Sequence, residues 1–159
     1  QVLHDTKNGR PPRCDLVAEL ALNTTLLGLI QSGLIKSAHD CSEGGLAVAL
    51  AECCFSELTA RNTPRMIGVE VDLTGTDSGN HDRLDALLFG ETTGRVIITT
   101  TELDSVKAVE RAKLMGVPAQ YIGTVGGASL KIKTHGGDYT WEVAGLHDLW
   151  WNAISNAMA

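Results

Sequence analysis

Hydrophobic residues recur along the chain with two periods, one typical of helices and one typical of strands. From Leu16 to Gly33 they repeat near every 3.6 positions, and Asp15 stands where a helix N-cap is expected. Over 67–73, apolar and polar residues alternate, which predicts a strand with one side in water. The segment 146–157 carries apolar residues at i, i+3, i+4, i+7, i+8 and i+11, the most regular amphipathic helix pattern in the chain.

The remaining segments complete an alternation of helices and strands. We expect strands at 35–39, 96–100, 120–125, 130–134 and 139–143, a short helical turn at 84–88, and helices at 46–55 and 102–115. The helix at 46–55 is apolar on nearly every side and should be deeply buried. Glycine pairs at 126–127 and 136–137 predict hairpin turns. Because both βα alternation and consecutive hairpins occur, the sequence predicts an α/β (α+β) domain, a three-layer sandwich with a mixed sheet.

The N-terminal segment differs from the rest of the chain. It is polar and contains Pro11 and Pro12, and two consecutive prolines neither start a strand nor sit inside a helix. We therefore predict an arm or linker at 1–15 and a single domain at 16–159, a size typical of one domain. Since the chain opens at Gln1 rather than Met, we expect a fragment or a processed piece of a longer protein.

Composition and charge exclude several classes of partner. Hydrophobic residues make up 43% of the 159, which is ordinary for a folded globular protein. The chain has 13 Lys and Arg against 19 Asp and Glu, giving a net charge of −6. Such a surface repels phosphate backbones and anionic lipids, so we predict neither nucleic acid nor membrane as a partner. No apolar run of about 18 residues is present that would span a bilayer.

The cysteines and histidines do not form a recognisable metal or disulfide pattern. Their spacing fits neither a disulfide framework nor a zinc site, and no HxxxH or HExxH motif occurs. We therefore predict no metal site, and free thiols in the reducing environment of the cytoplasm, at Cys14, Cys41, Cys53 and Cys54.

The most informative stretch is a polar turn between a predicted strand and a predicted helix. It contains Asp40, Ser42, Glu43, Gly44 and Gly45. The N–H groups and the positive dipole end of a helix that begins at two glycines can form a phosphate pocket. The alternative is structural: Ser42 caps the helix, and the glycines let it pack tightly on its sheet. The spacing alone favours the structural role, because Glu43 would repel an anion.

His39 and Asp40, which open this turn, could form an acid–base pair. Adjacent residues at the end of a strand point to opposite sides, however. We therefore do not expect a direct hydrogen bond between their side chains, and we interpret His39 as a core or hinge residue.

A second stretch precedes the predicted strand at 96–100. Its one carboxylate, two hydroxyls and one guanidinium could bind a ribose, an amide or a phosphate, at Glu91, Thr92, Thr93 and Arg95. A turn closed by a Glu91–Arg95 ion pair explains the same residues equally well.

Residues 37–52, SAHDCSEGGLAVALAE, are similar to a signature of the phosphoribosylformylglycinamidine synthase family (formylglycinamide ribonucleotide amidotransferase, synthetase subunit). In this family the signature belongs to a C-terminal domain of the type related to aminoimidazole ribonucleotide synthetase. The run HD-x-SEGGL is its specific part. GRPPRCDL at 9–16, LLFGETTGRVII at 87–98 and LHDLWWNAI at 146–154 extend the resemblance over nearly the whole chain.

This resemblance implies a role in purine biosynthesis. The family converts formylglycinamide ribonucleotide, ATP and glutamine-derived ammonia to formylglycinamidine ribonucleotide. ATP and magnesium bind mainly in N-terminal domains that this chain lacks. We therefore expect no catalytic residue, no metal site, no cofactor and no catalysis in the isolated chain. The implied partners are the ATP-site domains of the same polypeptide and a glutaminase domain or subunit, and the isolated chain could form a homodimer.

The resemblance also assigns residues. The turn from Asp40 to Gly45 matches the family motif directly. The substrate-contacting loop of the first C-terminal copy reads Glu-Ser-Gln, and it corresponds to Glu91, Thr92 and Thr93 here. Only Glu91 matches, as expected of a second, pseudo-symmetric copy that has lost the substrate role.

Two other hypotheses remain open from the sequence. The chain could be a binding module for a small anion, with the Gly44–Gly45 helix start as its site. It could also be the same domain from another member of the superfamily, of the selenophosphate synthetase or hydrogenase maturation type.

Overall fold

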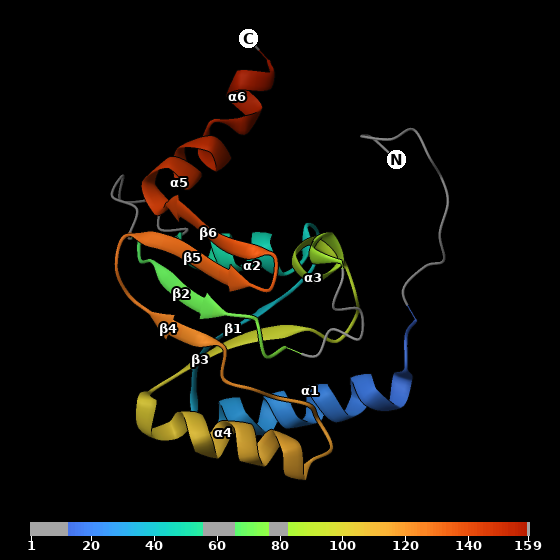
Figure 1. Ribbon diagram of the computed structural model, residues 1–159. Helices are drawn as coiled ribbons and strands as arrows, with labels where there is room; N and C mark the ends of the chain where they lie inside the picture. The colour runs from blue at the N-terminus through green and yellow to red at the C-terminus, as the bar shows by residue number, and fades with distance from the viewer. Residues whose placement is uncertain (1–12, 56–65, 77–82, 159) are drawn as a thin grey trace.

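The order of helices and strands agrees with the sequence prediction except at the C-terminal helix. The structure is a computed structural model that describes residues 13–55, 66–76 and 83–158 (Figure 1). The C-terminal helix is divided at Asn152 into two. The elements are α1 Leu16–Gln31, β1 Ile35–Asp40, α2 Gly45–Cys53, β2 Val69–Asp72, α3 Leu84–Phe89, β3 Val96–Thr100, α4 Glu102–Leu114, β4 Gly123–Val125, β5 Ser129–Thr134, β6 Gly137–Glu142, α5 Val143–Trp151 and α6 Ala153–Ala157. The predicted arm lies outside the described residues apart from residues 13–15.

The strands form two sheets. β1 and β3 make an antiparallel pair, and the other sheet has the order β4-β2-β5-β6. β2 and β5 run parallel while the other pairs are antiparallel, so the predicted mixed sheet is confirmed. The described strands do not form a single sheet, because β1 and β3 pair only with each other. The three-layer stacking stays a prediction.

One of the two predicted hairpins is wrong. The turn at 126–127 does not join paired strands, because β2 lies between β4 and β5. Gly68, just before β2, accepts a hydrogen bond from the Gly126 N–H (2.7 Å) and donates one to the Gly127 carbonyl (2.9 Å). The turn at 136–137 does close a hairpin, since β5 and β6 pair from Ser129–Glu142 to Thr134–Gly137.

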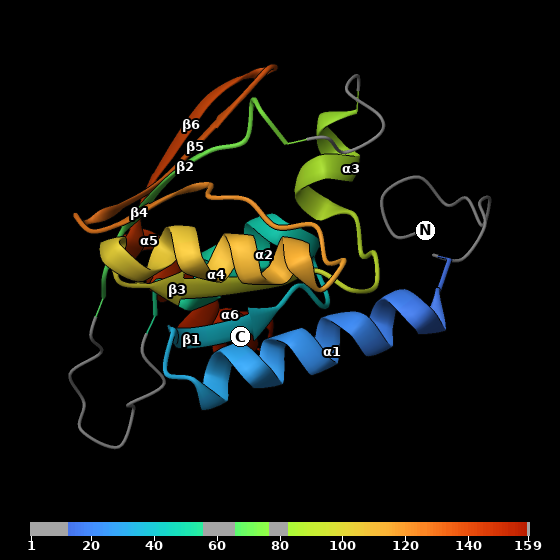
Figure 2. The same cartoon turned by 90° about the horizontal axis from the view of Figure 1, so that it is seen from below.

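Local signals explain where α1 begins and ends. The Asp15 carboxylate accepts hydrogen bonds from the N–H groups of Val17 (3.0 Å) and Ala18 (3.2 Å), which confirms the predicted N-cap. Beyond the end of the helix, Gly33 has a φ of +69°, a left-handed conformation that favours glycine. α1 and α4 lie side by side along the β1–β3 sheet (Figure 2).

The main core lies between α2 and the four-stranded sheet. Its buried members come from α2, α3, β2, β5 and the segments beside them: Cys41, Leu46, Ala49, Leu50, Cys54, Val71, Leu73, Leu88, Leu130, Ile132 and Val143. The prediction that α2 is buried on nearly every side is only partly met, since Val48 and Cys53 are exposed to solvent. The described cysteines form no disulfide, as predicted. Within the described segments, no helix is long and apolar enough to cross a membrane.

Two helical faces that the sequence marks as apolar are uncovered. On α1 the exposed residues include Leu16, Val17 and Leu20, and only Thr25 and Leu29 are buried. The regular stripe on α5 and α6 is largely exposed as well, with Leu149 at 69% and Ile154 at 76%. Periodicity thus predicted the helices, but it did not predict which side of α1 is buried, and most residues of both patterns are exposed among the described residues.

Candidate functional site

The structure brings the two predicted site segments together. The register of β1 and β3 sets Asp40 opposite Val96, so the turn after β1 and the loop before β3 emerge at the same end of this sheet. The Cys41 N–H donates to the Arg95 carbonyl at 2.9 Å and continues the pairing into both loops. We call the turn at 40–45 and the loop at 91–95 together the helix-start site.

The start of α2 is held by a carboxylate from the other loop. The Gly44 N–H donates to Oε1 of Glu91 at 3.0 Å. Gly44 is itself the N-cap residue, with a φ of +78° and no side chain to bond the helix. The prediction that Ser42 is the cap is wrong, because its hydroxyl donates to the Asp40 carboxylate. A carboxylate at this position is stabilised by the positive end of the helix dipole.

Gly45 provides the close packing that the structural interpretation predicted, though against a helix rather than a sheet. Its φ is +66°, and a Cβ built on it would lie 2.8 Å from the Phe89 carbonyl carbon and 3.0 Å from the Gly90 oxygen. These are backbone atoms at the end of α3, and they cannot move aside as a side chain would. The glycine is therefore required by both conformation and contact.

Arg95 ties the loop to the end of α3. Its guanidinium donates to the carbonyls of Gly90 (3.2 Å) and Leu87 (3.3 Å), groups that a helix end leaves unpaired. The predicted Glu91–Arg95 ion pair is not formed between these two described residues, because each side chain reaches a different helix end. The start of α2 and the end of α3 meet where Gly45 lies against the backbone of Phe89.

The two threonines contribute less. The Thr93 hydroxyl donates to the carbonyl of Arg13 at 3.3 Å and connects the loop to the segment before α1. Thr92 is exposed and makes no hydrogen bond with any described residue. Neither threonine takes part in a ligand-binding arrangement with the described residues.

Three carboxylates and one guanidinium, that of Arg95, lie around the helix start, so its net charge is negative. The Ser42 hydroxyl holds the pKa of the Asp40 carboxyl below its ordinary value, so Asp40 is ionised at neutral pH. Glu43 is exposed next to it, and Glu91 occupies the Gly44 N–H. An anionic ligand would have to displace one carboxylate and approach two others, which is unfavourable. Cys41 lies in the same turn, between Asp40 and Ser42. Burial raises the pKa of its thiol, which therefore stays protonated.

His39 does not pair with the Asp40 carboxylate, as expected. Its Nδ1 lies 2.6 Å from the Asp40 carbonyl oxygen, and its Nε2 lies 3.5 Å from Oε2 of Glu52 in the last turn of α2. Sequence reasoning missed Glu52. The order of elements could have indicated this contact. A helix that follows a strand after a tight turn runs antiparallel to that strand, so the end of α2 comes to lie beside β1.

Removing the Glu91 carboxylate is expected to destabilise the helix start. Glu91→Ala leaves the Gly44 N–H without its charged acceptor and should lower the free energy of unfolding by about 1 kcal/mol, as for other N-cap contacts. Urea unfolding followed by circular dichroism measures this. Glu43→Ala is the matched control, since this neighbouring carboxylate makes no hydrogen bond or ion pair with the described residues. An equal loss in both variants would contradict the assigned contact.

Comparison with known proteins identifies the family. A family model described as AIR synthase related protein, C-terminal domain, matches residues 2–134. The chain belongs to this family. The fold and family predicted from HD-x-SEGGL are therefore confirmed.

Two relatives of this AIR synthase related domain carry the same name. The phosphoribosylformylglycinamidine synthase subunit PurL of Anaeromyxobacter dehalogenans (strain 2CP-C) is 41% identical over 132 residues, which cover 82% of this chain and 17% of that protein. The PurL subunit of Methanocaldococcus jannaschii is 41% identical over 133 residues, covering 84% and 16%. The chain thus spans 17% or less of the length of these two relatives.

Solved structures share the fold. T. maritima PurL complexed with FGAR aligns with a TM-score of 0.70 at 18% identity, over 89% of this chain and 23% of that one. PurLQS from Thermotoga maritima aligns with a TM-score of 0.68 at 20% identity, over 84% and 22%. At these identities the likeness concerns the fold of the domain.

Proposed function

We propose that this chain is the C-terminal domain of a phosphoribosylformylglycinamidine synthase that acts in purine biosynthesis. The complete enzyme would convert formylglycinamide ribonucleotide, ATP and glutamine-derived ammonia to formylglycinamidine ribonucleotide, as a C–N bond-forming ligase in the cytoplasm. The observation that carries the proposal is the 41% identity to PurL subunits over more than four-fifths of the chain, from two distant organisms.

Within that enzyme, the domain would have a structural role. Glu91 corresponds to a residue that the family resemblance places on the substrate in the other copy. Here its carboxylate bonds the Gly44 N–H, and Arg95 bonds the carbonyls at the end of α3. These contacts support a structural role for Glu91 and Arg95, which connect the start of α2 to the end of α3, and not a role in substrate binding.

ATP and magnesium would bind in the ATP-site domains. In the parts of this chain that the structure describes, no group of three or more His, Cys, Asp or Glu side chains comes together as a metal site. The acidic helix start also fits a nucleotide phosphate poorly. We therefore assign no role in binding ATP or magnesium to the described residues of this chain.

The uncovered apolar faces support the proposed partners. The exposed side of α1 and the stripe on α5 and α6 are large surfaces of the kind that marks interfaces. We assign them to contacts with the ATP-site domains of the same polypeptide, and to a homodimer when the chain is alone. A glutaminase domain or subunit would supply ammonia, and a PurLQS assembly of T. maritima is among the solved structures with this fold.

A domain exchange tests the proposal. The matching segment of A. dehalogenans PurL is replaced by this chain, and the hybrid is assayed for formylglycinamidine ribonucleotide formation with its partner subunits. We expect an active hybrid, whereas the 159-residue chain alone should turn over no ATP. ATP turnover by the isolated chain, or a folded hybrid without activity, would overturn the proposal.

Calorimetry separates this proposal from the small-anion module. We expect no measurable heat when ADP or formylglycinamide ribonucleotide is titrated into the isolated chain. Binding that Glu91→Ala strengthens would instead assign the helix start to an anion.

A further inference from the structure

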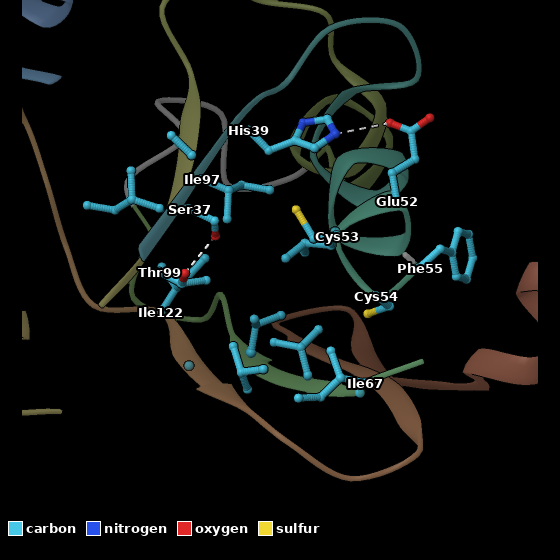
Figure 3. Close-up of a pocket in the computed structure, with 18 of the residues that line it drawn as sticks. Ser37, His39, Glu52, Cys53, Cys54, Phe55, Ile67, Ile97, Thr99 and Ile122 are labelled. Carbon is cyan, nitrogen blue, oxygen red and sulfur yellow. Dashed lines mark hydrogen bonds and ion pairs between the residues drawn. The ribbon is translucent and has the colours of Figure 1, made fainter. Parts of the chain in front are cut away.

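A cavity separate from the helix-start site lies between the two sheets, closed on one side by the last turn of α2 (Figure 3). Its volume is about 650 Å³, within the range of small-molecule sites. Side chains from β1, β3, α2, β2 and β4 point into it, and Trp150 of α5 closes one side. Apart from Trp150, which also belongs to the exposed stripe on α5, the proposed function uses none of these residues.

The lining is mostly apolar with few polar groups. Ile97 on one sheet and Ile122 beside the other face the same space. The hydroxyls of Ser37 and Thr99 lie 2.6 Å apart and satisfy each other. Few well-placed polar groups in an apolar wall are typical of ligand sites.

Glu52 gives the cavity its charge. Among the described lining residues it is the only carboxylate, and none of them is Lys or Arg. Oε2 of Glu52 lies 3.5 Å from Nε2 of His39, which also lines the cavity, and the Glu52 side chain is 42% exposed. With a net charge of −6 on the chain, the site favours a cationic group over an anionic one.

Aromatic rings border the same cavity. Phe55 and Trp150 both line it, and their ring centroids lie 5.8 Å apart. Trp150 is 43% exposed, so part of its indole is free to stack on a planar molecule. Aromatic faces also attract cations, in agreement with the charge of Glu52.

We infer that this cavity binds a small planar aromatic molecule that carries one cationic nitrogen group. The ring lies between the isoleucine walls and Trp150, and the nitrogen group donates to the Glu52 carboxylate. This site goes beyond the proposed function, and its test does not depend on the activity of the complete enzyme.

Benzamidine is the probe, and Cys53 is the reporter. Cys53 lines the cavity and is exposed, while Cys14 is exposed and does not line it. Burial raises the pKa of the Cys53 thiol, so alkylation by N-ethylmaleimide is followed at mildly alkaline pH by peptide mass spectrometry. We expect benzamidine to slow alkylation of Cys53 in a saturable manner and to leave Cys14 unchanged. The neutral isostere benzamide should protect Cys53 less well, and benzoate should not protect it.

Two variants locate the binding. Glu52→Gln should raise the benzamidine concentration for half-protection by about fivefold, as for a partly exposed charge pair. Glu110→Gln, an exposed carboxylate on α4, should leave it unchanged. Val125 lines the cavity from the edge strand β4 and is 50% exposed. Val125→Phe should fill part of the cavity and abolish the protection of Cys53 by benzamidine, with little effect on folding.

Three results would overturn the inference. These are an unchanged Cys53 rate at all benzamidine concentrations, equal protection by benzoate, and full protection in a Val125→Phe protein whose thermal midpoint is that of the original chain.

Discussion

Replacing Gly45 with alanine is expected to lower the free energy of unfolding by about 3 kcal/mol. Its φ of +66° is left-handed, which costs a residue with a Cβ about 1–2 kcal/mol. The added Cβ would also lie 2.8–3.0 Å from backbone atoms of Phe89 and Gly90, so α2 and α3 would have to separate. The variant should therefore loosen the whole helix-start site rather than one turn.

A variant at Gly33 separates the cost of the left-handed φ from the cost of the contact with α3. It has a similar φ of +69°, but nothing lies within 4 Å of the position of its Cβ. Gly33→Ala should therefore show the conformational cost alone, about 1–2 kcal/mol. Urea unfolding of both variants by circular dichroism gives the comparison. Equal losses in the two proteins would mean that the contact with α3 contributes nothing.

Signals that lie close together in the sequence predicted the local structure well. Asp15 identified the start of α1, because a cap and its helix are only two or three residues apart. The glycine pair before Leu46 identified the start of α2 and its close packing in the same way. The family motif then identified the fold as a whole.

Contacts between distant residues could not be predicted in the same way. The partner of Gly44 is 47 residues away, and only the β1–β3 register brings Glu91 to it. An ion pair with Arg95 was the simpler expectation, because the two residues lie four positions apart. The charges were thus located correctly, but their partners depend on tertiary structure.

The division into two sheets has a similar cause. Alternation of apolar and polar residues shows that a segment is a strand, but it does not show which neighbour it pairs with. The glycines at 126–127 suit a hairpin, yet they bond across to Gly68, and β2 separates the flanking strands. In the same way, the sequence identified the apolar residues of α1, but it did not show that most of them are exposed among the described residues.

Ile132→Ala is expected to produce the largest loss of stability among single substitutions on β5, about 3–4 kcal/mol. Ile132 is 1% exposed and lies in β5, between Val71 of β2 and Tyr139 of β6. Truncation leaves a cavity between the sheet and α2, and β5 cannot shift to fill it because it is paired on both sides. Lys131→Ala, the next residue on the exposed face, should change stability by no more than about 0.5 kcal/mol. If both variants unfold at the same urea concentration, the main core does not lie on the α2 face of this sheet.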